Sequence, residues 1–177
     1  MPIPGKAWQH IIFNTRSSWL TGDPRGFRSR NHRKHSGGDY RTPPPTGQHA
    51  GLFRVVRDGS RPTVKLPKRL WACIGQAVLS KCDEQGHRVL VIAIDHLHVH
   101  VLVELPSDRE KVKQIAGSWK QRASHAVRDE LPGSIWSKSC DPVVISDESH
   151  HRRAYQYILD HAKQGAWVWS FRDGEGS

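Results

Sequence analysis

The chain has 177 residues, a length that suits one domain, and only 36% of them are hydrophobic, so we expect a small core and a polar surface. The formal net charge of +10 favours a polyanionic partner, since Lys and Arg contacts to phosphates release counterions. No apolar run reaches the roughly 18 residues that a membrane span needs, and three cysteines without CxxC spacing indicate neither a disulfide framework nor a zinc knuckle, so we expect a cytoplasmic protein without a membrane partner.

The N-terminal part of the chain predicts one strand followed by a long loop. Residues 8–20 begin with an apolar run, Ile11 to Phe13, that suits a strand. Residues 21–51 are dense in Gly, Pro, Arg and His and have no sustained periodicity, which indicates an extended basic insertion. With Phe27 and Tyr40 among its cations, this loop could follow a nucleic-acid backbone and stack on bases, but a flexible basic insertion without that role fits the same composition.

The middle of the chain predicts a helix and then a hairpin. Residues 66–86 have apolar residues at helical spacing, and Gly86 is a natural stop. The stretches "RVLVIAI" and "HVHVLVEL" follow with strand character. Together they are too long for one strand, so a turn at residues 95–97 gives two antiparallel strands.

The C-terminal part predicts two helices around a short strand. Ser107 and Glu110 have capping-box spacing at the start of a helix over 107–131. The stretch "DPVVIS" suggests a short strand, and residues 147–165 suggest a last helix ending at Gly165. The whole order predicts an α+β fold, an antiparallel sheet flanked by helices, as a single domain over residues 1–177 with 21–51 as a loop insertion.

Two histidines of the second hairpin strand form a candidate metal site. His98 and His100 are two residues apart on a strand, so both side chains project from one face. Two imidazoles at that spacing can ligate one divalent metal ion, although paired strand histidines are often only hydrogen-bonded surface residues. His96 falls in the turn and need not join them.

The last helix adds a candidate nucleophile. Tyr157 and His161 are four residues apart and therefore neighbours on one helix face, while Tyr155 lies on another side. A phenol beside a metal-ligating imidazole is a plausible nucleophile toward a phosphodiester, and ordinary helix packing is the competing interpretation for Tyr157.

These motifs, in this order, resemble the single-tyrosine HUH transposases, the IS200/IS605-like enzymes and their relatives associated with repetitive extragenic palindromes (REP). The resemblance is carried by "HVHVLVELP", the Lys-containing helix after it, "LPGSIW", "VVISD" and "YQYILDH". It covers residues 8–20 and 87–164. HUH stands for His, a bulky hydrophobic residue and His, and the "ELP" that follows selects His98 and His100 as that pair.

The resemblance implies a fold, a site and an activity. The fold would be an HUH palm, with His98 and His100 as metal ligands, His161 as the third ligand and Tyr157 as the nucleophile. The enzyme would be a DNA endonuclease and transposase that uses Mg²⁺ or Mn²⁺, cleaves single-stranded, hairpin-containing DNA through a 5′-phosphotyrosine, and acts as a homodimer.

Three departures from the family pattern bear on these expectations. The family turn often reads Met-Pro-Asn/Asp, whereas this chain has "AIDHL", so His96 could be an extra ligand or a group that orients a ligand. His161 replaces the usual amide, which favours manganese over magnesium. The insertion at 21–51 has no counterpart in the family pattern, so a domesticated relative is an alternative to a mobile element's own enzyme.

Basic side chains outside the site are candidate phosphate contacts, with a solvated charged face as the competing interpretation: Arg25, Arg28, Arg30, Arg33, Lys113, Lys120, Arg122, Arg152 and Arg153. Three other functions fit parts of the pattern. The first is a non-catalytic protein that binds nucleic-acid hairpins. The second is a phosphoesterase without a covalent step, and the third is a histidine-rich metal store.

Overall fold

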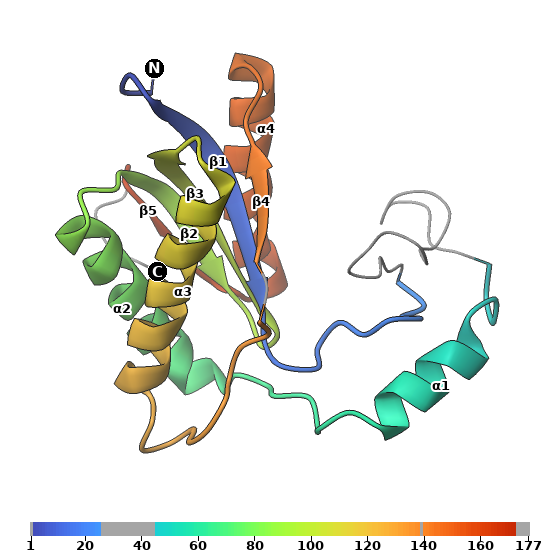
Figure 1. Ribbon diagram of the computed structural model, residues 1–177. Helices are drawn as coiled ribbons and strands as arrows, with labels where there is room; N and C mark the ends of the chain where they lie inside the picture. The colour runs from blue at the N-terminus through green and yellow to red at the C-terminus, as the bar shows by residue number, and fades with distance from the viewer. Residues whose placement is uncertain (1, 26–44, 139, 173–177) are drawn as a thin grey trace. The chain divides into compact units, whose positions relative to one another are not determined.

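The computed structural model describes residues 2–25, 45–138 and 140–172 (Figure 1). The chain divides into two compact units. The first, which we call the sheet unit, comprises residues 1–15 and 65–177, and the second, the basic unit, comprises residues 16–64. The basic unit is thus longer than the insertion expected at 21–51, and the organisation as one domain stays a prediction.

The sheet unit is built on an antiparallel sheet with the strand order β4-β1-β3-β2-β5. Its strands are β1 (Lys6–Asn14), β2 (Val89–Ile94), β3 (His98–Pro106), β4 (Asp141–Val144) and β5 (Trp167–Ser170). The two nine-residue strands β1 and β3 pair along their whole length at the centre. This arrangement confirms the predicted α+β fold.

The predicted hairpin is formed by β2 and β3, and Asp95 closes its turn. The Oδ1 atom of Asp95 accepts the backbone N–H groups of Leu97 and His98 at 2.7 and 2.9 Å. Such a side-chain bond two and three residues ahead is the usual way in which aspartate shapes a tight turn. The turn fixes where β3, and with it His98, begins.

Helices cover both faces of the sheet (Figure 1). The short 3₁₀ helix η1 (Lys68–Leu70) leads into α2 (Trp71–Glu84), which packs beside α3 (Arg109–Ala126). On the other face α4 (Glu148–Leu159) buries Ala154 and Ile158 against Val91, Ala93 and Leu102 of the sheet. Because strand side chains alternate, the β3 face that carries Leu102 also carries His98 and His100.

Several predicted helix ends differ from the structure. The helix predicted over 66–86 is η1 followed by α2, and the helix predicted over 107–131 is α3, which ends at Ala126. The N-cap of α3 is Asp108, whose carboxylate accepts the N–H groups of Glu110 and Lys111, so the predicted cap at Ser107 is wrong by one residue. The predicted helix over 147–165 is α4, capped by Asp147, followed by the 3₁₀ helix η2 (Asp160–Gln164). Gly165 then ends the segment with a φ of 84°, a value that suits glycine.

Two elements were not expected from the sequence. Strand β5 adds an edge to the sheet beside β2, and its Trp167 lies so close to α2 that a Cβ on Gly75 would be 2.0 Å from the Trp167 ring. In the basic unit, helix α1 (Ala50–Asp58) begins within the last two residues of the loop predicted over 21–51 and buries none of its residues. No helix among the described residues is long and apolar enough to cross a membrane.

Candidate active site

Three histidines from two distant segments meet on the α4 face of the sheet. His98 and His100 lie on β3, and His161 lies on η2 immediately after α4. Their candidate ligand atoms are all within 4.8 Å of one another, and the ring centroids of His100 and His161 are 4.5 Å apart. His100 and His161 are buried, and His98 is partly exposed. The structure thus brings together the three residues that the sequence analysis named as metal ligands.

Each of these histidines has its Nδ1 atom engaged by another group. Nδ1 of His98 lies 2.5 Å from Oδ1 of Asp95, Nδ1 of His161 lies 2.9 Å from the backbone carbonyl oxygen of Tyr157, and Nδ1 of His100 lies 2.9 Å from Nε2 of His10. Histidines that ligate metals usually present one ring nitrogen to the ion and hydrogen-bond with the other, most often to a carboxylate or a carbonyl. The Nε2 atoms are therefore the ones left to hold an ion.

Burial and neighbouring groups shift the pKa values of His100 and Asp95. Burial, with His98, His10 and His161 nearby, holds the pKa of His100 well below its usual value, so the ring is neutral and can act as a ligand. Burial raises the pKa of Asp95, but hydrogen bonds from His98 and Leu97 outweigh it and lower that pKa to about 2, so Asp95 is ionised behind His98.

An orphaned atom shows that the cluster fits a metal ion. Nε2 of His100 is buried and has no hydrogen-bond partner among the described residues. A buried polar atom without a partner is costly, and a divalent ion held by three imidazole nitrogens would satisfy it. His98, His100 and His161 are thus suited to hold a metal ion together.

Tyr157 lies beside the histidine cluster and remains accessible. Its ring centroid is 4.8 Å from that of His161 and 5.7 Å from that of His100, and 47% of the residue is exposed. Tyr155, two residues earlier on α4, points elsewhere and shares a 2.7 Å hydrogen bond with Ser170 of β5. The structure therefore places the phenol of Tyr157, rather than that of Tyr155, where a ligand of the histidine cluster could be reached.

Two residues that the sequence analysis missed contact the candidate ligands. His96, which was considered as an additional or orienting group, is exposed on the turn, whereas its neighbour Asp95 contacts His98. His10 contacts His100 from β1. His10 reaches the site because β1 pairs with β3, with Ile12 opposite His100. No local sequence motif predicts that pairing.

The candidate phosphate contacts differ in their surroundings. Arg28, Arg30 and Arg33 lie outside the described residues. Lys120 is buried, and its ammonium donates to the carbonyl oxygen of Ser137, so we leave it out of any surface interface. The remaining five are partly or largely exposed and each contacts an acidic or hydroxyl partner: Arg25 with Asp23, Lys113 with Glu110, Arg122 with Glu84, Arg152 with Glu148 and Arg153 with Ser149.

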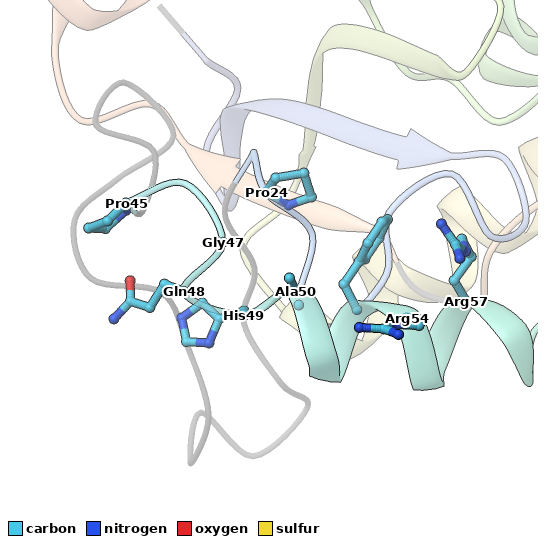
Figure 2. A pocket seen from close by; sticks show the side chains of 10 residues that line it. Pro24, Pro45, Gly47, Gln48, His49, Ala50, Arg54 and Arg57 are labelled. Carbon is cyan, nitrogen blue, oxygen red and sulfur yellow. The ribbon is translucent and has the colours of Figure 1, made fainter.

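The basic unit has a hollow of its own. Residues 16–64 contain ten Lys and Arg against three Asp and Glu, a net charge of +7 out of the protein's +10. Figure 2 shows the hollow, where Arg54 and Arg57 of α1 lie near Pro24, Gln48 and His49. Arg54 and Arg57 are exposed and three residues apart, so they lie on one side of the helix.

Comparisons with known proteins gave matches to structures only. No family model and no curated protein matches the chain. A putative transposase from Deinococcus radiodurans is 15% identical, with a TM-score of 0.39, over 88% of this chain and 90% of that one. A REP-associated tyrosine transposase, solved bound to a REP hairpin, is 13% identical, with a TM-score of 0.51, over 93% of this chain and 71% of that one. The chain therefore has the fold of a REP-associated tyrosine transposase, the kind of protein that its sequence motifs resemble.

Proposed function

We propose that the protein is a metal-dependent single-stranded DNA nuclease and strand transferase that acts through a 5′-phosphotyrosine. One observation carries the proposal: the accessible phenol of Tyr157 packs against His100 and His161, two of the three histidines whose Nε2 atoms are left for a metal ion. A nucleophile, a cation site and a transposase fold on one chain are the parts that this chemistry requires.

Tyr157 supplies the covalent step of the proposed reaction. Its phenolic oxygen attacks the scissile phosphorus and loses its proton, the bond from phosphorus to the 3′ oxygen breaks, and that oxygen gains a proton. The products are a 5′-phosphotyrosine and a free 3′-OH. A second 3′-OH can reverse the step and join strands, and no ATP is needed because the phosphotyrosine keeps the energy of the broken bond.

His98, His100 and His161 are the residues that would hold the metal ion. When bound, a divalent cation would neutralise phosphate charge and favour the phenolate form of a nearby tyrosine. Magnesium strongly prefers oxygen ligands, whereas the first-row transition-metal ions, of which Mn²⁺ is one, also accept imidazole nitrogens. We therefore expect Mn²⁺ to support activity better than Mg²⁺.

We assign the recognition of DNA mainly to the basic unit. Its net charge of +7 and the exposed Arg54 and Arg57 suit the phosphates of a nucleic-acid strand. The structural relative bound to a REP hairpin supports hairpin-containing single-stranded DNA as the substrate class. Homodimer formation stays a prediction from the resemblance.

The test uses end-labelled single-stranded DNA that contains a hairpin, incubated with protein and Mn²⁺ and run on a denaturing gel. The wild type is expected to carry label as a covalent adduct, and Tyr157→Phe should form none while it still shifts the DNA in a native gel. Tyr155→Phe is the matched control, since its hydroxyl bonds Ser170 instead of facing the histidines.

Other outcomes of this experiment would indicate a different nucleophile or a different function. An adduct that persists in Tyr157→Phe and disappears in Tyr155→Phe would move the nucleophile to the other tyrosine. DNA cleavage without any adduct would indicate a phosphoesterase that uses water. Binding without cleavage under any metal would indicate a non-catalytic hairpin-binding protein.

A further inference from the structure

His10 is a buried residue that touches both parts of the candidate active site. It is 8% exposed on β1, and its Nε2 atom lies 2.9 Å from Nδ1 of His100, with the two ring centroids 5.1 Å apart. Its ring also meets the ring of Tyr157 edge-on at a centroid distance of 6.0 Å. A residue in contact with a proposed ligand and with the proposed nucleophile can orient both.

The surroundings determine which of His10 and His100 donates the hydrogen bond between them. If His10 donated, His100 would carry its own hydrogen on Nε2, which is buried and has no partner among the described residues. A buried N–H without an acceptor is unfavourable, and such a nitrogen has no lone pair for a metal. If His100 donates from Nδ1, its Nε2 lone pair points into the histidine cluster instead.

The state of His10 agrees with an accepting role. A neutral imidazole with its hydrogen on Nδ1 has a lone pair on Nε2, the atom of His10 that lies 2.9 Å from Nδ1 of His100. The other two candidate ligands already face acceptors, the Asp95 carboxylate for His98 and the Tyr157 carbonyl for His161. With His10 as an acceptor, the Nδ1 atom of each of the three candidate ligands faces an acceptor.

We propose that His10 is a positioning residue that accepts the Nδ1–H of His100 and so holds Nε2 of His100 toward His98 and His161. The purpose of this arrangement rests on the proposed metal site, but the hydrogen bond belongs to the protein without metal and can be measured there. Outer groups of this kind typically change metal affinity by about 10–100-fold when removed.

The experiment combines two measurements on the full chain. Nitrogen-15 NMR of histidine-labelled, metal-free protein reports which ring nitrogen of His100 carries the hydrogen, with His100→Gln used to assign the signal. Titration with Mn²⁺, followed by the EPR signal of the free ion, reports affinity. The variants are His10→Leu, which removes the acceptor, and His10→Gln, which offers an amide oxygen in its place.

Gln9→Leu is the matched control. Gln9 immediately precedes His10 on β1 and is also buried, and its side chain donates to the carbonyl oxygen of Pro106. Because its side chain projects from the opposite face of β1, its loss should affect folding stability without reaching the histidines. Thermal denaturation of all variants separates a loss of fold from a loss of metal binding.

The expected results are an Nδ1–H form of His100 in the wild type, a loss of Mn²⁺ affinity of about 10–100-fold in His10→Leu, and a change of only a few-fold in His10→Gln and Gln9→Leu. An Nε2–H form of His100 in the wild type would overturn the inference, and so would unchanged Mn²⁺ affinity in His10→Leu. Wild-type protein with the Nδ1–H form but no affinity for Mn²⁺ would uphold the hydrogen bond and remove the metal from the proposed function.

Discussion

Charge is distributed differently in two regions of the molecule, the histidine site of the sheet unit and the basic unit. At the site, buried rings of His10 and His100 are held neutral, and their polar atoms are directed at one another. In the basic unit, seven net positive charges are carried by residues 16–64, and helix α1 buries none of its side chains. The histidine site is a fixed arrangement of neutral rings, whereas the basic unit carries most of the protein's net positive charge.

This contrast teaches that rate and affinity should be separable in this protein. Groups held in a preorganised site act on the reacting atoms, so their loss lowers the rate of the chemical step. Exposed arginines mainly attract the phosphate backbone. Their loss therefore lowers the affinity for DNA and makes that affinity less dependent on salt. A substitution in one region should therefore leave the property of the other region unchanged.

The largest effect is expected from removing a candidate metal ligand. His100→Ala should slow DNA cleavage by roughly 10³-fold at saturating DNA, because the cluster loses its most buried nitrogen ligand. Its affinity for DNA should change little. Single-turnover cleavage with Mn²⁺, beside a native-gel titration, measures both quantities, and undiminished cleavage would remove the metal site from the account.

A smaller effect is expected on folding stability when the pH is lowered, because of His10. The folded pKa of His10 is about 4 and its ordinary value is 6.5, so between these pH values the unfolded chain binds a proton that the folded chain does not. Folding stability should therefore fall as the pH drops below 6.5, and His10 should account for about 2 kcal/mol of the loss between pH 7 and pH 5.

Urea denaturation of metal-free protein at pH 7 and pH 5 tests this contribution. His10→Gln, which does not titrate, should lose about 2 kcal/mol less than the wild type over this interval. Arg54→Ala with Arg57→Ala should keep the wild-type pH dependence, because arginine stays charged throughout. Equal losses in the wild type and in His10→Gln would show that His10 does not titrate as inferred.

The smallest effect is expected in the basic unit. Replacing Arg54 and Arg57 together by Ala should weaken DNA binding and reduce the slope of log affinity against log salt by about 1.4, since each contact to a single strand contributes about 0.7. The cleavage rate at saturating DNA should stay the same. Arg69→Ala, an exposed arginine paired with Glu130 in the sheet unit, is the control.

A fall in the cleavage rate at saturating DNA in the Arg54 and Arg57 double variant would show that the basic unit also contributes to the chemical step. An unchanged salt slope would instead place the phosphate contacts elsewhere on the chain.

Local sequence signals were sufficient for the elements that carry the candidate ligands. The alternation of His98 and His100 with valines predicted β3, and the four-residue spacing of Tyr157 and His161 predicted that they are neighbours. The structure brings all four together because α4 packs on the face of the sheet that presents the two strand histidines.

The features that were missed depend on contacts between distant segments. His10 reaches His100 only through the pairing of β1 with β3, and β5 exists because β2 offers it an edge and Gly75 leaves room for Trp167. Asp95 was assigned to the turn, but its contact with His98 follows from the shape of that turn. Such long-range pairings are not encoded in local periodicity.

The most direct test of the central claim is to locate the covalent bond. Protein reacted with hairpin-containing single-stranded DNA and Mn²⁺ is digested with nuclease and trypsin, and the peptide of residues 154–163, which contains both Tyr155 and Tyr157, is fragmented in a mass spectrometer. If Tyr157 is the nucleophile, a nucleotide will be attached through phosphate to Tyr157. A nucleotide on Tyr155, or cleaved DNA with an unmodified peptide, would contradict it.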